Sequence, residues 1–347
     1  MPTRLILTGD INLMNVEDPA IPFNRVIPAF RKADVVFGNL ECCLYQPPGG
    51  RHIEHEGFFA NPTVATEALR QAGFDAVGLA NNVNYGEAAI TASIAALDRM
   101  GMPHTGAGAN RDAAHAPAIV TKNGQRIGFL QRSSVYWPTN HEAAAHAPGI
   151  AVLQAHTAYQ IPMHKTRREI PPMNRPGLPP TILTWPDPKY LQTFRDEIEA
   201  LRASTDIVVA SCHWGLGREV LTYMTEIAHA AIDAGAHVVI GHGPHHFLPV
   251  EMYRDRPIFY GLGSFSFHTG HGGHKHGDWI GMMADVTIDA GKTTRAGFRF
   301  VRHNDRNETV FCQHANEAAA VHEAQAVCDP LGVSLVAEDD TLWVDLS

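Results

Sequence analysis

The chain has 347 residues, of which 45% are hydrophobic, so it can bury the core of one large α/β domain or of two smaller ones. A net charge of −9, with Lys and Arg scattered, gives no reason to expect a nucleic acid or an anionic membrane as partner. The first residues pass at once into a predicted strand, and no long apolar span occurs, so we expect a soluble, cytoplasmic protein.

The amino-terminal half alternates strands and helices. Strands are predicted at 5–7, 35–37 and 76–79, and helices at 24–32, 61–73 and 87–100. Asn61 can cap the second helix, and Pro62 suits its first turn. Two short strands at 118–121 and 126–130, joined by Asn123 and Gly124, are typical of a hairpin.

A proline-rich insertion at about 136–188 interrupts this pattern. Proline lacks the amide donor that strands and helix interiors need, so we expect an irregular but ordered excursion or a lid. The insertion holds Trp137, His141 and further His and Arg side chains. It is interpreted either as a determinant of substrate choice or as a plain surface loop.

Regular structure returns after the insertion. Helices are predicted at 190–203, 219–234 and 316–327, and strands at 207–210, 238–240, 257–267, 281–288, 296–302 and 342–345. The three consecutive strands within 257–302 suggest a second sheet packed on the first. We expect one domain over residues 1–347, with two mixed sheets sandwiched between helices.

Histidine and cysteine both carry information. There are 21 histidines, some of them in a His/Gly-rich segment at 268–277 that we expect to be a mobile loop, an adventitious metal binder or a lid. The five cysteines form no CxxC pair, and we expect them to be reduced. Cys212 adjoins His213 but is interpreted as a small apolar strand residue rather than a nucleophile.

Five predicted strands end in residues that can bind metal or transfer protons. These ends are Gly9-Asp10, Asn39-Leu40-Glu41, Ala80-Asn81-Asn82, His213-Trp214-Gly215 and Gly241-His242-Gly243-Pro244-His245. The carboxyl ends of strands in an open α/β sheet meet at one crevice, so five such ends can converge. The pattern predicts an enzyme site.

The order of these motifs resembles that of the capsule-biosynthesis (CapA-type, poly-γ-glutamate) family, a branch of the calcineurin-like metallophosphatase superfamily. The resemblance continues through 247–251 and 258–265, and it covers roughly residues 4–135 and 190–290. It implies a four-layer α/β/β/α sandwich of the metallophosphatase type.

The resemblance also implies a set of metal ligands. Carried over residue by residue, these are Asp10, Glu41, Asn82, His213 and His242, with Glu41 as the bridging carboxylate and with Mn, Zn or Fe as the cation. His245 is added as a catalytic residue that need not reach the metal. Asn39, interpreted as orienting Glu41, is expected to contact substrate together with Asn81, Trp214 and Glu219.

The chain departs from the family pattern at three places. Asn12 stands where the wider superfamily has a first-motif His, and two residues separate His242 from His245 rather than one. Val83 stands where relatives carry the His that acts as general acid, and valine cannot donate a proton. Candidates to replace this acid are His52, His55 and the 268–276 loop.

Three functions are compatible with these residues. The first is a metal-dependent hydrolase of an amide, glutamyl or peptide-like, or of a phosphoester. The second is a peptide epimerase without a cofactor, in which Asp10 or Glu41 takes an α-carbon proton and a histidine returns one. The third is a non-catalytic binder. In each case the partner is a small molecule or a peptide, and the oligomeric state is left open.

Overall fold

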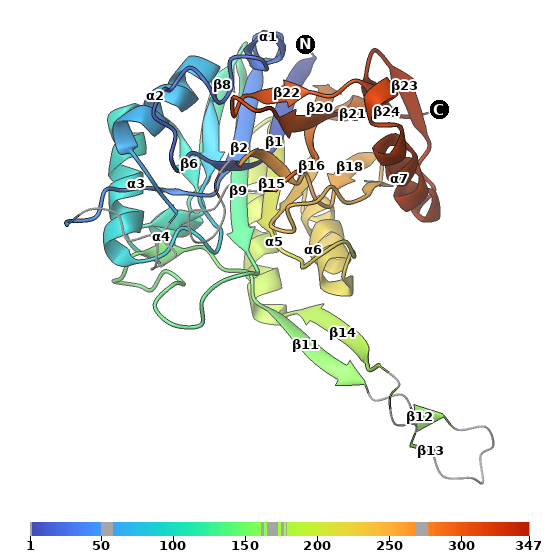
Figure 1. Cartoon of the computed structure of the whole chain (residues 1–347). Helices are drawn as coiled ribbons and strands as arrows, with labels where there is room; N and C mark the ends of the chain where they lie inside the picture. Colours follow the sequence, from blue (N-terminus) through green and yellow to red (C-terminus); the bar gives the residue numbers. More distant parts are fainter. Residues whose placement is uncertain are drawn as a thin grey trace.

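A ten-stranded and a six-stranded sheet form the body of the protein (Figure 1). The computed structural model describes residues 2–49, 58–160, 163–164, 173–174, 177, 179–267, 269 and 277–346. The larger sheet has the order β23 (Leu335–Glu338), β24 (Thr341–Val344), β21 (Lys292–His303), β20 (Gly281–Asp289), β1 (Thr3–Asn12), β2 (Val35–Leu40), β5 (Ala76–Gly78), β6 (His104–Thr105), with β19 (Ser264–Phe267) beside β1 and β22 (Thr309–Phe311) beside β21. The smaller sheet has the order β17 (Val250–Tyr253), β18 (Arg256–Phe259), β16 (Val238–His242), β15 (Ile207–His213), β9 (Gln125–Ser133), β8 (Ala118–Lys122).

Both sheets are mixed, as predicted. The central pairs β1–β2 and β15–β16 are parallel, whereas β20 runs antiparallel to β1 and β8 antiparallel to β9. The β8–β9 pair is the hairpin predicted at Asn123-Gly124, where both residues have positive φ (51° and 78°). The parallel centre places the carboxyl ends of β1, β2 and β5 at one edge of the larger sheet.

The two sheets share one apolar core. Leu5 and Leu7 of β1 pack in the same cluster as Val209 and Ile240 of the smaller sheet. In the same cluster, Phe37 of β2 stacks on Phe129 of β9 with ring centroids 4.5 Å apart. Alternate residues of the same strands, such as Ile6, face the other way, because successive side chains of a strand point to opposite faces.

Helices pack on the outward-facing residues. α2 (Pro62–Ala72) and α3 (Glu87–Arg99) share a core with β1 and β2, whereas α5 (Pro188–Ser204) and α6 (Thr222–Asp233) share another with β15 and β16 (Figure 1). The side chain of Asn61 caps α2 by accepting from the amides of Thr63 and Val64, which confirms that prediction. The remaining α-helices among the described residues are α1 (Ile27–Phe30), α4 (Arg111–His115) and α7 (Ala318–Cys328).

Three sequence predictions of elements are wrong in part. The helix expected at 24–32 is reduced to α1, because Pro28 lacks the amide that would bond to Asn24. The strand expected at 257–267 is two strands, β18 and β19, and the chain crosses from the smaller to the larger sheet between them through Gly263 at φ 68°. Consequently β20 and β21 extend the first sheet instead of forming a second one.

The proline-rich insertion is more regular than predicted. β11 (Ala155–Gln160) and β14 (Thr181–Pro186) form an antiparallel ribbon that extends away from the body (Figure 1). The short pairs β3–β4 (Cys43–Leu44, Phe59–Ala60), β7–β10 (Ala107–Gly108, Gly149–Ile150) and β12–β13 (Met163–His164, Met173–Asn174) complete the strands. Of the part of the insertion between 161 and 178, the structure describes only isolated positions.

Two further predictions concern the whole chain. The five cysteines are free and buried, and burial raises the pKa of Cys212 to about 12, so this thiol is a packing residue as expected. Among the described residues no helix combines the length and the apolar character needed to cross a membrane.

Candidate active site

Five predicted catalytic residues lie together at the ends of β1, β2, β15 and β16. His213 Nε2 and His245 Nε2 each lie 3.7 Å from Glu41 Oε1. Asp10 lies between two imidazoles, with His242 Nδ1 3.2 Å from its Oδ1 and His245 Nδ1 3.3 Å from its Oδ2. The structure therefore places all five side chains in one continuous chain of carboxylates and imidazoles.

Strand register explains this convergence. His213 is the direct neighbour of His242 across the parallel β15–β16 pair, and Asp10 is the neighbour of Asn39 across β1–β2. Gly9 is needed for the close approach of β1 to the crossover, since a Cβ there would lie 1.9 Å from the carbonyl oxygen of Gly263. The amide of Asp10 donates to that same oxygen at 2.9 Å. The Gly-Asp motif thus reflects a packing requirement as well as a functional one.

One group of donor atoms in this cluster is close enough to share a divalent cation: the ligand atoms of Asp10, Glu41 and His245 all lie within 4.8 Å of one another. Three further buried atoms of the cluster have no hydrogen-bond partner among the described residues: Glu41 Oε2, His213 Nε2 and His242 Nε2, while His242 Nδ1 contacts Asp10. Leaving buried polar groups unpaired costs about 1–3 kcal/mol each, so such a group of orphans needs a physical reason. Carboxylate oxygen and imidazole nitrogen are the ligands that Zn²⁺ and similar cations take.

Ser133 sets the tautomer of His213. The Ser133 hydroxyl donates to the carbonyl oxygen of Val135 at 2.6 Å, so its contact of 3.4 Å with His213 Nδ1 requires the imidazole to donate. His213 Nε2 then carries the lone pair and faces Glu41. A hydrogen bond that orients the distal nitrogen in this way is typical of metal-ligating histidines.

Asp10 is a fully buried carboxyl group that stays ionised. Burial by itself would raise its pKa, but hydrogen bonding and charge from His242 and His245 hold that pKa well below its ordinary value. The amide nitrogen of Asn39 also donates to Asp10 Oδ1, at 2.9 Å. Asn39 therefore orients Asp10 and not Glu41, which corrects our prediction for this residue.

His245 differs from the two strand histidines. Its side chain is 32% exposed, against 2% for His213 and 0% for His242, so it is the one of the three that open solvent reaches. Although burial lowers its pKa, the charges of Glu41 and Asp10 and a hydrogen bond to Asp10 raise it to about 9. Its φ of 57° is a left-handed conformation that a non-glycine residue rarely adopts, a form of strain that concentrates at functional sites.

Gln131 of β9 is a site residue that sequence reasoning missed. It is fully buried and reaches from the smaller sheet to the larger one, where Nε2 donates to Asn39 Oδ1 at 3.0 Å and Oε1 accepts from the amide of Ala80 at 2.7 Å. Asn81 also donates to Asn39 Oδ1, at 3.0 Å. The available signal was a sixth polar strand end, Gln131-Arg132-Ser133, which follows the apolar run of β9.

The predicted substrate-contacting residues do not form one surface. Asn39 and Asn81 are fully buried in the network around Asp10, and Trp214 is fully buried with its indole N–H donated to the carbonyl oxygen of Tyr260 at 2.8 Å. Glu219 is exposed in the loop before α6. Asn82 is half-buried, and its side chain makes no hydrogen bond to any described residue, which leaves its amide oxygen available as a ligand.

A histidine of the insertion, His141, contacts Asn84, the residue that follows Val83. His141 accepts from the amide of Trp137 and donates to the carbonyl oxygen of Asn84 at 3.0 Å, so both ring nitrogens are occupied. Burial lowers its pKa to about 4, and His141 therefore cannot serve as the missing acid. His52, His55 and His268, His271, His274 and His276 lie outside the described residues.

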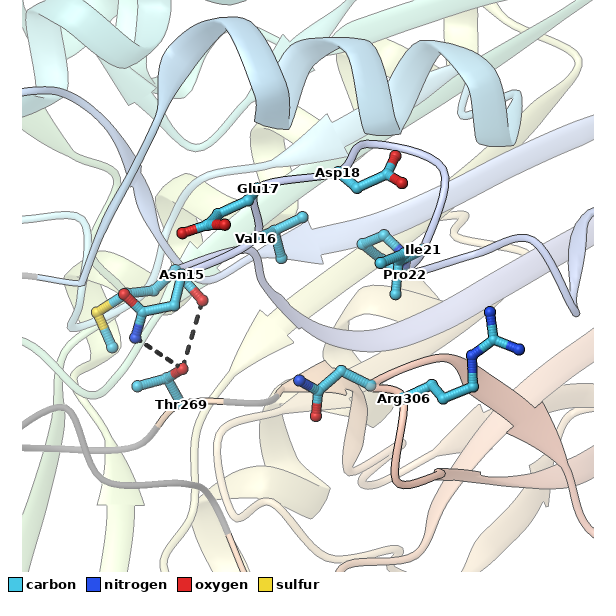
Figure 2. Close-up of a pocket in the computed structure, with 10 residues that line it drawn as sticks. Asn15, Val16, Glu17, Asp18, Ile21, Pro22, Thr269 and Arg306 are labelled. Carbon is cyan, nitrogen blue, oxygen red and sulfur yellow. Dashed lines mark hydrogen bonds between the residues drawn. The ribbon is translucent and has the colours of Figure 1, made fainter.

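A surface pocket of about 490 Å³ adjoins the end of β1 (Figure 2). Residues 14–18, which follow β1, form one wall, and Arg306 lies on another. Asn15 and Thr269, which follow β1 and β19, are joined by a hydrogen bond of 3.1 Å. This pocket has charged groups of both signs. Glu17 and Asp18 follow the Asp10 strand within a few residues, and Arg306 comes from the loop after β21.

Comparison with known proteins gives a family match over most of the chain. Residues 4–269 match the profile of the family described as "Bacterial capsule synthesis protein PGA_cap". The chain belongs to this family. The PGA biosynthesis protein CapA of Bacillus subtilis is 26% identical over 253 residues, which cover 72% of this chain and 57% of that protein.

Other relatives give the same picture. A probable polyglutamine synthesis accessory protein of Mycobacterium tuberculosis is 30% identical over 205 residues, covering 57% of this chain and 46% of that protein. A Sinorhizobium fredii protein whose name states no function is 26% identical over 311 residues, covering 76% and 66%. The chain thus spans less than two thirds of the length of these curated relatives.

Proposed function

We propose that this capsule-synthesis family member is a metal-dependent hydrolase that cleaves an amide or phosphoester bond. The observation that carries this proposal is the group of buried, unpaired donor atoms on Glu41, His213 and His242. We assign the cation ligands as Asp10, Glu41, Asn82, His213 and His242. A divalent cation in such a site acidifies a water molecule and polarises the bond under attack.

The residues around these ligands have distinct roles in this proposal. Asn39 holds the Asp10 carboxylate, Gln131 holds Asn39, and Ser133 contacts the His213 ring. His245 is the proton donor to the leaving group, because it is the exposed histidine of the cluster and Val83 cannot fill that role. Its contacts with Asp10 and Glu41 keep the ring oriented.

For the substrate we propose an amide of glutamyl or peptide type. The names of the Bacillus and Mycobacterium relatives concern poly-glutamate or polyglutamine synthesis, and this link favours an amide over a phosphoester. The pocket of Figure 2 would hold the part of the substrate beyond the scissile bond, with Arg306 available to a carboxylate. We further propose a single domain with the four-layer order α/β/β/α, supported by three apolar clusters between successive layers.

The test uses protein purified without a His-tag. Elemental analysis should find a divalent metal, and hydrolysis in ¹⁸O-labelled water should place ¹⁸O in the carboxylate or phosphate product, with activity lost to a chelator. Activity that persists after complete metal removal would contradict the hydrolase proposal.

A second candidate is a metal-independent epimerase of a peptide. The specific observation in its favour is that a carboxylate and an imidazole lie side by side, with His245 Nδ1 3.3 Å from Asp10 Oδ2. Such a pair could remove and return a proton at an amino-acid α-carbon, and Val83 would not matter because no group leaves. In D₂O this reaction would place one deuterium on the α-carbon, leave peptide bonds intact and resist chelation.

A further inference from the structure

A small polar pocket lies on the far side of β9 from the Asp10 cluster. It has a volume of about 100 Å³, and its walls come from α4, the first turns of α5, the end of β9 and the loop around residue 142. The apolar part of the wall is Val152 and Phe194. Neither the proposed hydrolase site nor any motif of the sequence uses this pocket.

The charges that line the pocket do not balance. Arg111, Arg132 and Lys189 line the pocket with one acidic residue, Glu142. Glu197, which is not in the lining, pairs with Arg132 and His115. Both carboxylate oxygens of Glu142 accept from the hydroxyl of Tyr190, at 2.9 and 3.0 Å. Among the described residues, neither Arg111 nor Lys189 forms an ion pair. Other exposed arginines on the surface do pair with acidic side chains. The pocket is thus a positive site in a chain of net charge −9.

Arg132 adds a buried cation to the two exposed cations of this pocket. Its side chain is 1% exposed, and it pairs with Glu197 and donates to the carbonyl oxygens of Gln131 and His115. These bonds use three of the five N–H donors of a guanidinium group, so two remain without an acceptor among the described residues. The guanidinium plane is supported by Phe194, whose ring centroid lies 5.7 Å away. A buried guanidinium group with unused N–H donors is suited to bind an acceptor group of a ligand.

The size of the pocket limits that acceptor to a small group. A volume of about 100 Å³ is far below the several hundred Å³ of a typical cofactor site. Burial and Glu142 raise the pKa of Tyr190 to about 12, so its hydroxyl remains a donor and offers no negative charge. We propose that this pocket binds a small anion, a carboxylate or phosphate group, held by Arg111 and Lys189 at the rim and by the buried Arg132.

Isothermal titration calorimetry at constant ionic strength tests the proposal, with inorganic phosphate and acetate as separate probes. Wild-type protein should bind at least one of them saturably, and the tighter probe identifies the source of the anionic group. Arg111→Gln and Lys189→Gln should each weaken binding about five- to tenfold, because each removes one charge-assisted hydrogen bond. Both residues are exposed, so the fold should survive.

Two further variants separate this site from misfolding, and metal removal separates it from the hydrolase site. Glu142→Gln removes the lining negative charge, keeps an acceptor for Tyr190, and should tighten binding, a gain that misfolding cannot produce. Arg99→Gln, an exposed position on α3, is the matched control and should bind as wild type. Titrations repeated on chelator-treated protein should give the same affinity, which makes the result independent of any metal. Unchanged affinity in both Arg111→Gln and Lys189→Gln, or equal weakening in Arg99→Gln, would overturn the proposal.

Discussion

Replacing Gln131 with methionine tests whether the link between the two sheets holds the Asp10 cluster in place. Methionine is unbranched and similar in size, so the variant removes two buried hydrogen bonds with little change in volume. The amide of Ala80 then loses its acceptor, which costs about 1–3 kcal/mol, and Asn39 loses one of two donors to its oxygen, worth about 1 kcal/mol. We expect the free energy of unfolding to fall by about 2–4 kcal/mol.

Urea unfolding followed by circular dichroism measures this loss. The slope of free energy against urea should stay the same as in wild type, because the surface exposed on unfolding does not change. Leu130→Met is the matched control, because Leu130 precedes Gln131 on β9 and packs on the α5 and α6 side. This substitution conserves volume and should lower the free energy of unfolding by less than about 1.5 kcal/mol. A loss below about 0.5 kcal/mol in Gln131→Met would refute the view that this glutamine is structurally required.

Three further predictions concern metal, leaving group and pH. His213→Ala and His242→Ala should each lose most of the metal that wild type retains, measured by elemental analysis, whereas His229→Ala, on α6, should lose none; full retention in both site variants counts against the ligand assignment. If phosphoesters are cleaved, wild type should be slower on alkyl than on aryl phosphates, and Val83→His should narrow this difference; equal wild-type rates on both esters would contradict the reasoning. The ring of His237 is buried, and burial and nearby arginines lower its pKa to about 4. As pH falls, the unfolded chain therefore takes up this proton before the folded protein does. The free energy of unfolding should fall by about 2–3 kcal/mol as pH drops from 6.5 to 4. His237→Asn should flatten that part of the stability curve measured by urea unfolding, and an unchanged curve would exclude His237 as its source.

Local patterns in the sequence were sufficient for most of the secondary structure. Short continuous apolar runs predicted β1, β2, β15 and β16, and Asn61-Pro62 predicted the start of α2, because buried strands and helix caps depend on residues near one another in the chain. The same logic located Asp10, Glu41, His213 and His242, since each comes within about four residues of the end of a predicted apolar run. These residues could be named without knowing how the strands are ordered.

Tertiary structure decided which of these residues contact one another. Asn39 orients Asp10 rather than Glu41 because the β1–β2 register places it there, and Gln131 enters the network from a strand of the other sheet. The single predicted strand at 257–267 divides because Gly263 turns the chain from one sheet into the other, which also brings β19 beside Asp10. These contacts join residues that are 29 positions apart for Asn39 and Asp10 and 92 for Gln131 and Asn39, and no local propensity or spacing encodes them. They follow from sheet order and from the packing of two sheets on a common core.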